Sequence, residues 1–128
     1  MGIRIVRLGT ARLSGEGLRI GTVRRPPRGV RKSEFASLDY YDVWLPLLAP
    51  TADLVKLALA AESAKDWARF AARYRRQMSA TSESGLIDTL AALSHQADFS
   101  VGCYCANEGR CHRSILKSLL AERGAKLS

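Results

Sequence analysis

The sequence Phe99-Ser-Val-Gly-Cys-Tyr-Cys105, then Ala-Asn-Glu-Gly-Arg110, then Cys111-His-Arg113, decides the fold of this chain. Its first segment is apolar and predicts a strand over residues 99–105. The polar loop is short, and the apolar spacing that follows predicts a helix over residues 111–123. Ligands bind open α/β sheets where strand ends meet helix starts. We therefore expect a functional site at this turn.

The first third of the chain predicts strands and an irregular arm. Residues 3–8 and 18–23 have the length and apolar content of short strands. Pro26-Pro27 interrupts regular structure, because proline fixes the backbone and lacks a donor. Residues 29–42 are expected to form the arm, with a short strand or turn near residues 40–45.

The middle of the chain predicts helices. Thr51 is a good N-cap residue, and a second helix is expected to begin near Ser63, with apolar positions at three- and four-residue spacing. A third helix is expected from about Ser82, where Ser82, Glu83 and Ser84 are cap candidates. Strands at both ends with helices between them predict an α/β fold. We expect one domain over residues 1–128, with a short, mostly parallel sheet flanked by about four helices.

Composition limits the class of protein. The chain is 47% hydrophobic, as expected for a globular core. No apolar run approaches the roughly 20 residues that span a bilayer, and the amino terminus lacks the apolar core of a signal peptide. We expect a cytoplasmic protein with no membrane partner. Three cysteines in such a chain favour reduced thiols, a metal site or a reactive cysteine over a disulfide framework.

The net charge of +8 predicts either an anionic partner or a solvated basic surface. One basic group lies early in the chain and a second lies on a predicted helix. A small anionic molecule is one candidate partner, and nucleic acid is another. The two groups are Arg19, Arg24, Arg25, Arg28, Arg31 and Lys32, and then Arg69, Arg73, Arg75 and Arg76.

Residues 103–113 allow three chemical interpretations. In the first, Arg113 and helix N–H groups hold a phosphate or carboxylate, and Arg24 and Arg28 reach it from the segment around Pro26-Pro27-Arg28-Gly29. In the second, Cys105 is a reactive thiol, although its four-residue spacing to Arg110 is one short of the cysteine phosphatase loop. A sulfurtransferase loop is nearer in length but would contain the carboxylate of Glu108.

In the third interpretation, zinc or iron binds the set Cys103, Cys105, Cys111 and His112, although adjacent residues 111 and 112 project about 100° apart on a helix. The alternative without a site is that Cys103 and Cys105 are small buried hydrophobic residues.

Several segments in one order resemble the YeaO-like family, a bacterial and archaeal domain of unknown function 488. The resemblance covers nearly the whole chain and implies a compact α/β fold without an established reaction. Its elements are Val23-Arg24, Pro27-Arg28-Gly29-Val30-Arg31-Lys32, Tyr41-Asp42-Val43-Trp44-Leu45-Pro46, Leu48-Ala49-Pro50, Trp67-Ala-Arg-Phe70-Ala-Ala-Arg-Tyr74, Cys111-His112-Arg113 and Leu119 to Gly124.

The resemblance implies roles for Arg24, Arg28, Tyr74, His112 and Arg113. The family often has an acidic residue where Val23 stands, and its members can carry Asn where Cys111 stands, so it implies neither an acid at 23 nor a required thiol at 111.

Our leading hypothesis is a pocket for a phosphate- or carboxylate-bearing small molecule. Arg24, Arg28 and Arg113 hold the anion, and Tyr74 lies with them at the ligand. His112 donates or accepts a proton there, with Cys111 as neighbour or nucleophile. This hypothesis requires no cofactor.

Overall fold

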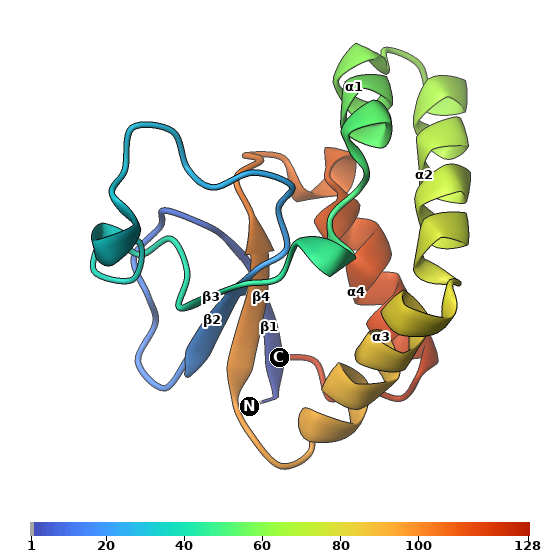
Figure 1. Ribbon diagram of the computed structural model, residues 1–128. Helices are drawn as coiled ribbons and strands as arrows, with labels where there is room; N and C mark the ends of the chain where they lie inside the picture. The colour runs from blue at the N-terminus through green and yellow to red at the C-terminus, as the bar shows by residue number, and fades with distance from the viewer. Residues whose placement is uncertain (1) are drawn as a thin grey trace.

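The computed structural model describes residues 2–128 and shows a four-stranded sheet with the helices gathered on one side (Figure 1). The strands are β1 (Ile3–Arg7), β2 (Leu18–Gly21), β3 (Val43–Trp44) and β4 (Phe99–Cys103). They lie in the order β1-β4-β2-β3, and every pair is parallel. The α/β class is confirmed, and the sheet is parallel throughout.

The helices begin close to where the sequence predicts them. They are α1 (Ala52–Ala60), α2 (Ala64–Met78), α3 (Thr81–Leu93) and α4 (His112–Glu122). Thr51 caps α1 by accepting a hydrogen bond from a backbone N–H, and Ser63 and Asp66 form a capping box at α2. Among residues 2–128, no helix has the length and apolar character needed to cross a membrane.

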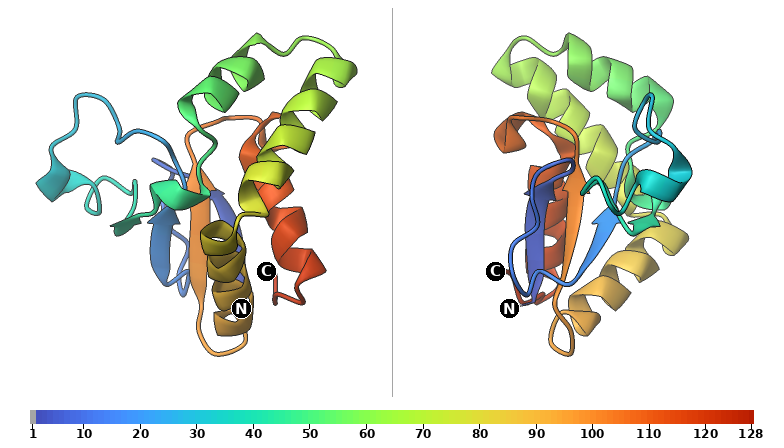
Figure 2. Two further views of the ribbon diagram at one scale, coloured as in Figure 1. Left: turned by 45° about the vertical axis from the view of Figure 1, so that its right-hand side comes forward. Right: turned by 90° about the vertical axis from the view of Figure 1, so that its left-hand side faces the viewer.

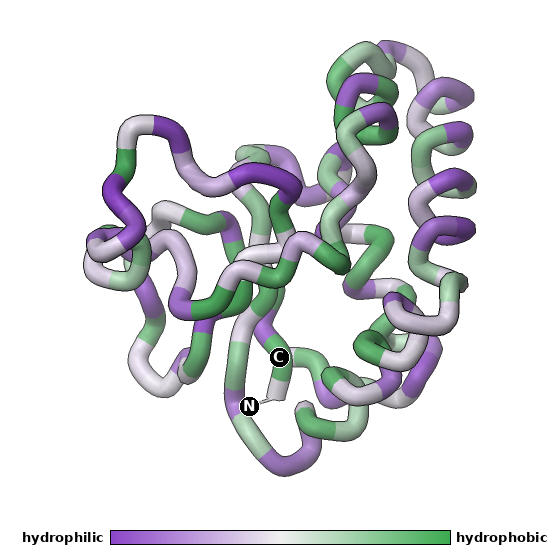
Figure 3. The backbone as a smooth tube through the Cα atoms, in the orientation of Figure 1, coloured by the Kyte–Doolittle hydropathy of each residue, from purple (hydrophilic) through white to green (hydrophobic). Residues whose placement is uncertain are grey.

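The core lies between the sheet and the helices. All five residues of the central strand β4 are buried, and α4 packs against β4, α2 and α3. Figure 3 shows hydrophobic positions on the inner side of α2 and hydrophilic ones outside, as an amphipathic helix requires. Large apolar residues of this core include Ile3, Leu48, Phe70, Tyr74, Met78, Ile87, Phe99, Leu116 and Leu120.

The opposite face of β4 is polar. Ser100 points to a buried ion pair between Glu16 and Arg19, whose side chains are only 2% and 1% exposed. The Arg19 guanidinium also donates to the main-chain oxygens of Thr10 and Asp39 at 2.8 and 2.7 Å. This pair therefore ties the loop after β1 to the segment before β3.

At one edge of the sheet, the carboxyl ends of the strands lie close to the start of α4 and to the segment that follows β2. Strand β4 ends at Cys103 rather than at residue 105, and Cys111 is the N-cap of α4. The irregular segment is longer than the predicted residues 29–42. It spans residues 22–42, called the arm from here on, and extends away from the helices (Figure 2). Its 3-10 turn is η1 (Lys32–Glu34); two further turns are η2 (Pro46–Leu48) and η3 (Glu108–Arg110).

Candidate functional site

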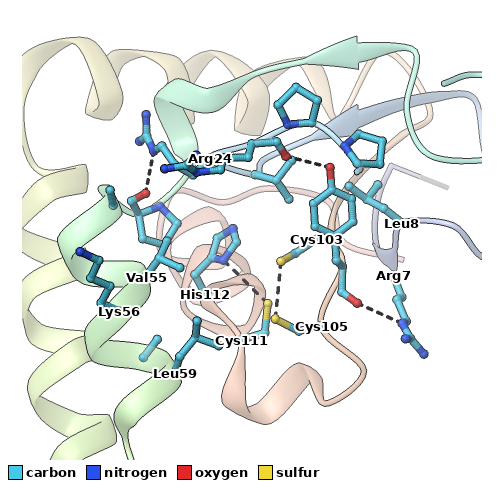
Figure 4. Close-up of a pocket in the computed structure, with 18 of the residues that line it drawn as sticks. Arg7, Leu8, Arg24, Val55, Lys56, Leu59, Cys103, Cys105, Cys111 and His112 are labelled. Atoms are coloured by element: carbon cyan, nitrogen blue, oxygen red, sulfur yellow. Dashed lines mark hydrogen bonds between the residues drawn. The ribbon is translucent and has the colours of Figure 1, made fainter. Parts of the chain in front are cut away.

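A cavity of about 880 Å³ opens at this edge (Figure 4). It lies between the start of the arm, helix α1, the end of β4 and the start of α4. Its volume falls in the range of roughly 300–1,000 Å³ that is typical of small-molecule sites. The expected location at the strand-to-helix turn therefore has room for a ligand.

The walls combine apolar side chains with positive charge. Six cationic residues line the cavity, and within residues 2–128 no Asp or Glu does so. Glu108, whose carboxylate would oppose an anion, is exposed and lies outside the lining. The cationic residues are Arg7, Arg24, Arg25, Arg28, Lys56 and Arg110.

Tertiary folding brings four of the predicted site residues together. Arg24 and Arg28 from the arm line the same cavity as Cys111 and His112 from the start of α4. The Arg24 guanidinium is already engaged, because its Nε donates to the Pro50 oxygen at 2.9 Å and its Nη2 donates to two neighbouring carbonyls. Arg28 is exposed. Arg24 thus shapes the wall, and Arg28 is the freer cation.

Tyr74 and Arg113 lie outside the cavity lining, contrary to the expectation that they contact the ligand. The Tyr74 hydroxyl donates to the Leu48 oxygen at 2.6 Å, and its ring packs edge-on against His112 at 5.5 Å. Arg113 is 4% exposed, and its Nη2 donates to the Cys105 oxygen at 2.7 Å. Consecutive helical residues point about 100° apart, so His112 faces the cavity while Arg113 supports the cysteine loop beneath it.

Three thiols and one imidazole converge on the floor of the cavity. Cys103 Sγ lies 3.7 Å from Cys105 Sγ, and Cys111 Sγ lies 3.8 Å from His112 Nδ1. The ligand atoms of Cys103, Cys111 and His112 all lie within 4.8 Å of one another. The alternative without a site predicts that Cys103 and Cys105 are buried. Cys103 is buried but Cys105 is exposed, and the two thiols are in contact with each other.

The protonation of His112 follows from its hydrogen bonds. Nε2 lies 2.6 Å from the Thr22 carbonyl oxygen, which can only accept, so Nε2 carries the proton. Burial lowers the pKa of His112 to about 4, although the bond to Thr22 opposes that shift. At neutral pH the ring is uncharged with a lone pair on Nδ1. Of the two roles that the sequence-based hypothesis gives His112, proton donor or proton acceptor, this geometry favours the acceptor, through Nδ1.

The thiols differ in acidity because they share hydrogen bonds. Hydrogen bonds from Cys103 and Cys111 lower the pKa of Cys105, against an opposing effect of burial. Its negative charge is further favoured by the positive charge of Arg113 nearby. The same contacts with Cys103 and Cys105, together with burial, raise the pKa of Cys111. Negative charge in the cluster is thus best placed on Cys105, the exposed member.

Main-chain contacts hold the cysteine loop against the arm. The Tyr104 hydroxyl donates to the Arg25 oxygen at 2.9 Å, and Arg7 Nε donates to the Tyr104 oxygen at 3.1 Å. On the other side, the Arg110 guanidinium lies over the Trp67 ring at 5.8 Å. These contacts position the thiols relative to the basic wall.

Sequence reasoning missed two cations of the lining. Lys56 lies on α1, whose Ala52, Val55 and Leu59 also line the cavity at helical spacing. That spacing was the available signal, because it places Lys56 on the same face. Arg7 ends β1, and only the parallel pairing of β1 with β4 places it beside residues 103–105.

A comparison of the sequence with models of protein families finds a match. The model described as the active DUF488-N3 subclade matches residues 3–124. The chain belongs to this family. Membership in the DUF488 family confirms the resemblance to the YeaO-like domain of unknown function 488. Neither the search of curated proteins nor the search of solved structures found a significant match.

Proposed function

We propose that this DUF488-family domain binds a phosphate-bearing small molecule in the cavity at the carboxyl edge of its sheet. The observation that carries the proposal is the lining of the cavity. Six cationic residues surround it, and among residues 2–128 no carboxylate does. Arginine guanidinium groups match phosphate oxygens in charge and geometry, so such a wall favours phosphate strongly.

The apolar part of the lining favours a ligand with an organic portion. Leu8, Val23, Val55, Leu59 and Phe70 line the cavity beside the cations. A small-molecule site typically combines apolar walls with a few polar groups that fix orientation. An aryl or other apolar phosphate ester satisfies both parts of the lining, whereas inorganic phosphate satisfies only the basic part.

The cations have different roles in this proposal. Arg24 holds η2 and the residues before α1 in place through three carbonyl oxygens. Arg25 and Arg28 are exposed and follow it on the arm. We assign anion contact to Arg25 and Arg28, and wall construction to Arg24.

A nucleic-acid-binding surface is the alternative, and the second basic group does not favour it. No basic residue of α2 lines the cavity, and Arg75 on that helix is paired with Glu122 at 2.9 Å. Nucleic-acid binding through many phosphates falls steeply with added salt. A single phosphate ester in a pocket is expected to show a much weaker salt dependence.

The test measures thermal unfolding with phenyl phosphate, and with phenol as the uncharged control. Selective binding to the folded state raises Tm as the ligand concentration increases. We expect phenyl phosphate to raise Tm and phenol to leave it unchanged. Calorimetric titration of Arg28→Ala should show affinity for phenyl phosphate reduced by about tenfold, because a charge-assisted hydrogen bond contributes about 1.5 kcal/mol or more.

Arg73→Ala is the matched control. Arg73 is exposed on α2 and lies outside the cavity lining. The Arg73→Ala substitution removes the same charge as Arg28→Ala. The affinity of the Arg73→Ala variant for phenyl phosphate should therefore stay within about twofold of that of the original protein. Equal losses in Arg28→Ala and Arg73→Ala would refute the pocket, and so would a Tm that does not respond to phenyl phosphate.

A further inference from the structure

The cluster of thiols and imidazole at the cavity floor has the spacing of a metal site. Zinc binds thiolate sulfur at about 2.3 Å and histidine nitrogen at about 2.0–2.1 Å in a tetrahedron. These bond lengths place two sulfur ligands about 3.8 Å apart, and a sulfur and a nitrogen about 3.5 Å apart. The observed separations are 3.7 Å between Cys103 and Cys105, and 3.8 Å from Cys111 Sγ to His112 Nδ1.

The hydrogen bond of His112 provides an independent second observation. Its Nε2 donates to the Thr22 carbonyl at 2.6 Å, which leaves the lone pair of Nδ1 directed at the thiols. Histidines that bind metals characteristically donate their other N–H to a carbonyl or carboxylate, which fixes the tautomer and the ring orientation. Thr22 is itself fixed, because its hydroxyl and N–H both donate to the Gly102 oxygen at 3.0 Å.

We propose that Cys103, Cys111 and His112 bind one Zn²⁺ ion, with Cys105 as the fourth ligand on the cavity side. The ligand atoms of the three buried residues lie within 4.8 Å of one another, and the exposed Cys105 has its Sγ 3.7 Å from that of Cys103 (Figure 4). Three sulfurs and one imidazole nitrogen suit zinc and exclude magnesium or calcium, which require oxygen ligands.

The charge of this site is balanced by its surroundings. Binding converts three thiols to thiolates and releases three protons to solvent, so Zn²⁺ with its ligands carries one net negative charge. The buried Arg113 guanidinium donates to the Cys105 main-chain oxygen, and its Nε has no hydrogen-bond partner in residues 2–128. An anionic metal centre gives this buried cation a counter-charge.

This site does not depend on the proposed phosphate binding. Phosphate binding is assigned to arginines of the arm and is tested with phenyl phosphate, whereas the metal is assigned to residues of β4, the following loop and α4. Either proposal can fail while the other stands, because one test reads Tm and affinity for an ester and the other reads bound metal and thiol reactivity.

The first experiment uses the whole protein, purified under reducing conditions without a chelator. Elemental analysis should find one zinc per chain. After removal of zinc, titration with Co²⁺ should give sulfur-to-cobalt charge-transfer bands that saturate at one equivalent and disappear when zinc is added. Because all three cysteines of the chain belong to the cluster, a thiol reagent reports on this site alone. One equivalent of zinc should slow the reaction of every thiol.

Two variants and one control separate ligation from folding. Cys105→Ser removes an exposed ligand and should still bind Co²⁺, with about one third less charge-transfer intensity because one of three thiolates is gone. His112→Gln should lose metal. His95→Gln is the control, because His95 is exposed, lies outside the thiol cluster and has its Nε2 2.8 Å from the Gly124 oxygen. It should retain one zinc per chain.

The proposal is overturned by any of three results. The first is protein without stoichiometric metal whose thiols react at the same rate with and without zinc. The second is stoichiometric iron in place of zinc. The third is a folded Cys105→Ser variant whose Co²⁺ spectrum equals that of the original protein.

Discussion

Replacing Glu16 by Gln removes the negative charge of a buried ion pair and leaves the positive charge of Arg19 in place. The pair is bidentate, with Arg19 Nε and Nη2 each donating to a Glu16 oxygen at 2.8 Å. Ser100 also donates to Glu16 at 3.1 Å. The Arg19 side chain is only 1% exposed, so water cannot take the place of the lost carboxylate.

The expected loss of stability is about 3–5 kcal/mol, the cost of leaving one partner of a buried pair uncompensated. That is a large part of the roughly 5–15 kcal/mol that stabilises a typical domain. For a chain of this length it corresponds to a fall in Tm of roughly 10–20 °C. The effect also reaches the candidate site, because Arg19 holds the Asp39 oxygen at the end of the arm.

The assay is urea unfolding of Glu16→Gln beside Glu122→Gln. Glu122 pairs with Arg75 at 2.9 Å, but their side chains are 55% and 42% exposed. An exposed pair contributes about 0–1 kcal/mol, so the Glu122 variant should unfold at nearly the original midpoint. A loss in Glu16→Gln no larger than that in Glu122→Gln, at an unchanged denaturant slope, would refute the argument from burial.

Three further predictions concern stability. Gly21→Ala places a Cβ against the ring of the buried Tyr41 and should lower the free energy of unfolding by about 1–3 kcal/mol. Gly85→Ala on α3 meets nothing within 4 Å and should raise it by about 0.5–1 kcal/mol. Urea midpoints that shift in the same direction in both variants would contradict this prediction. Tyr74→Phe leaves a buried carbonyl oxygen without its donor and should cost about 1–3 kcal/mol by the same assay. Burial alone would raise the pKa values of Glu16 and Asp42, but hydrogen bonds and arginine charges outweigh it and lower both. Stability from these groups is therefore complete above about pH 5 and falls as pH drops below about 4.5 through the folded pKa values; a Tm that stays constant between pH 5 and pH 3 would contradict the sign.

Local patterns predicted the elements around the site with good accuracy. The spacing on α2, its start near Ser63 and the cap at Thr51 lie where the sequence placed them, whereas α3 has Ala80 as its N-cap rather than a residue of 82–84. These features depend on neighbours within about one helical turn, so a sequence carries them directly. The prediction that the last strand continues to residue 105 was wrong, because the end of a strand depends on more than its neighbours in sequence. Residues 103–105 alternate like a strand, but a strand also needs a neighbouring strand to pair with, and β1 pairs only as far as Cys103.

The roles of the site residues were less predictable. Arg24 and Arg113 are both arginines beside the cavity region, yet carbonyl oxygens occupy two nitrogens of Arg24, and burial removes Arg113 from the lining. The free cations Arg25 and Arg28 look the same in sequence. Only the positions of distant carbonyl groups distinguish a guanidinium that supports the wall from one that faces the ligand.

The sequence by itself determined the α/β class, the helix starts and the strand-to-helix turn that carries the cysteines. The tertiary structure decided what those residues contact. The hydrogen bond to the Thr22 oxygen, ninety positions earlier in the chain, fixes which nitrogen of His112 carries the proton. The Ser100 hydroxyl donates to Glu16 across eighty-four positions. Such contacts form because parallel strands and the helices that cover them bring remote segments together in one core. The periodicity of each segment records which face is buried, but it does not record which distant segment that face meets.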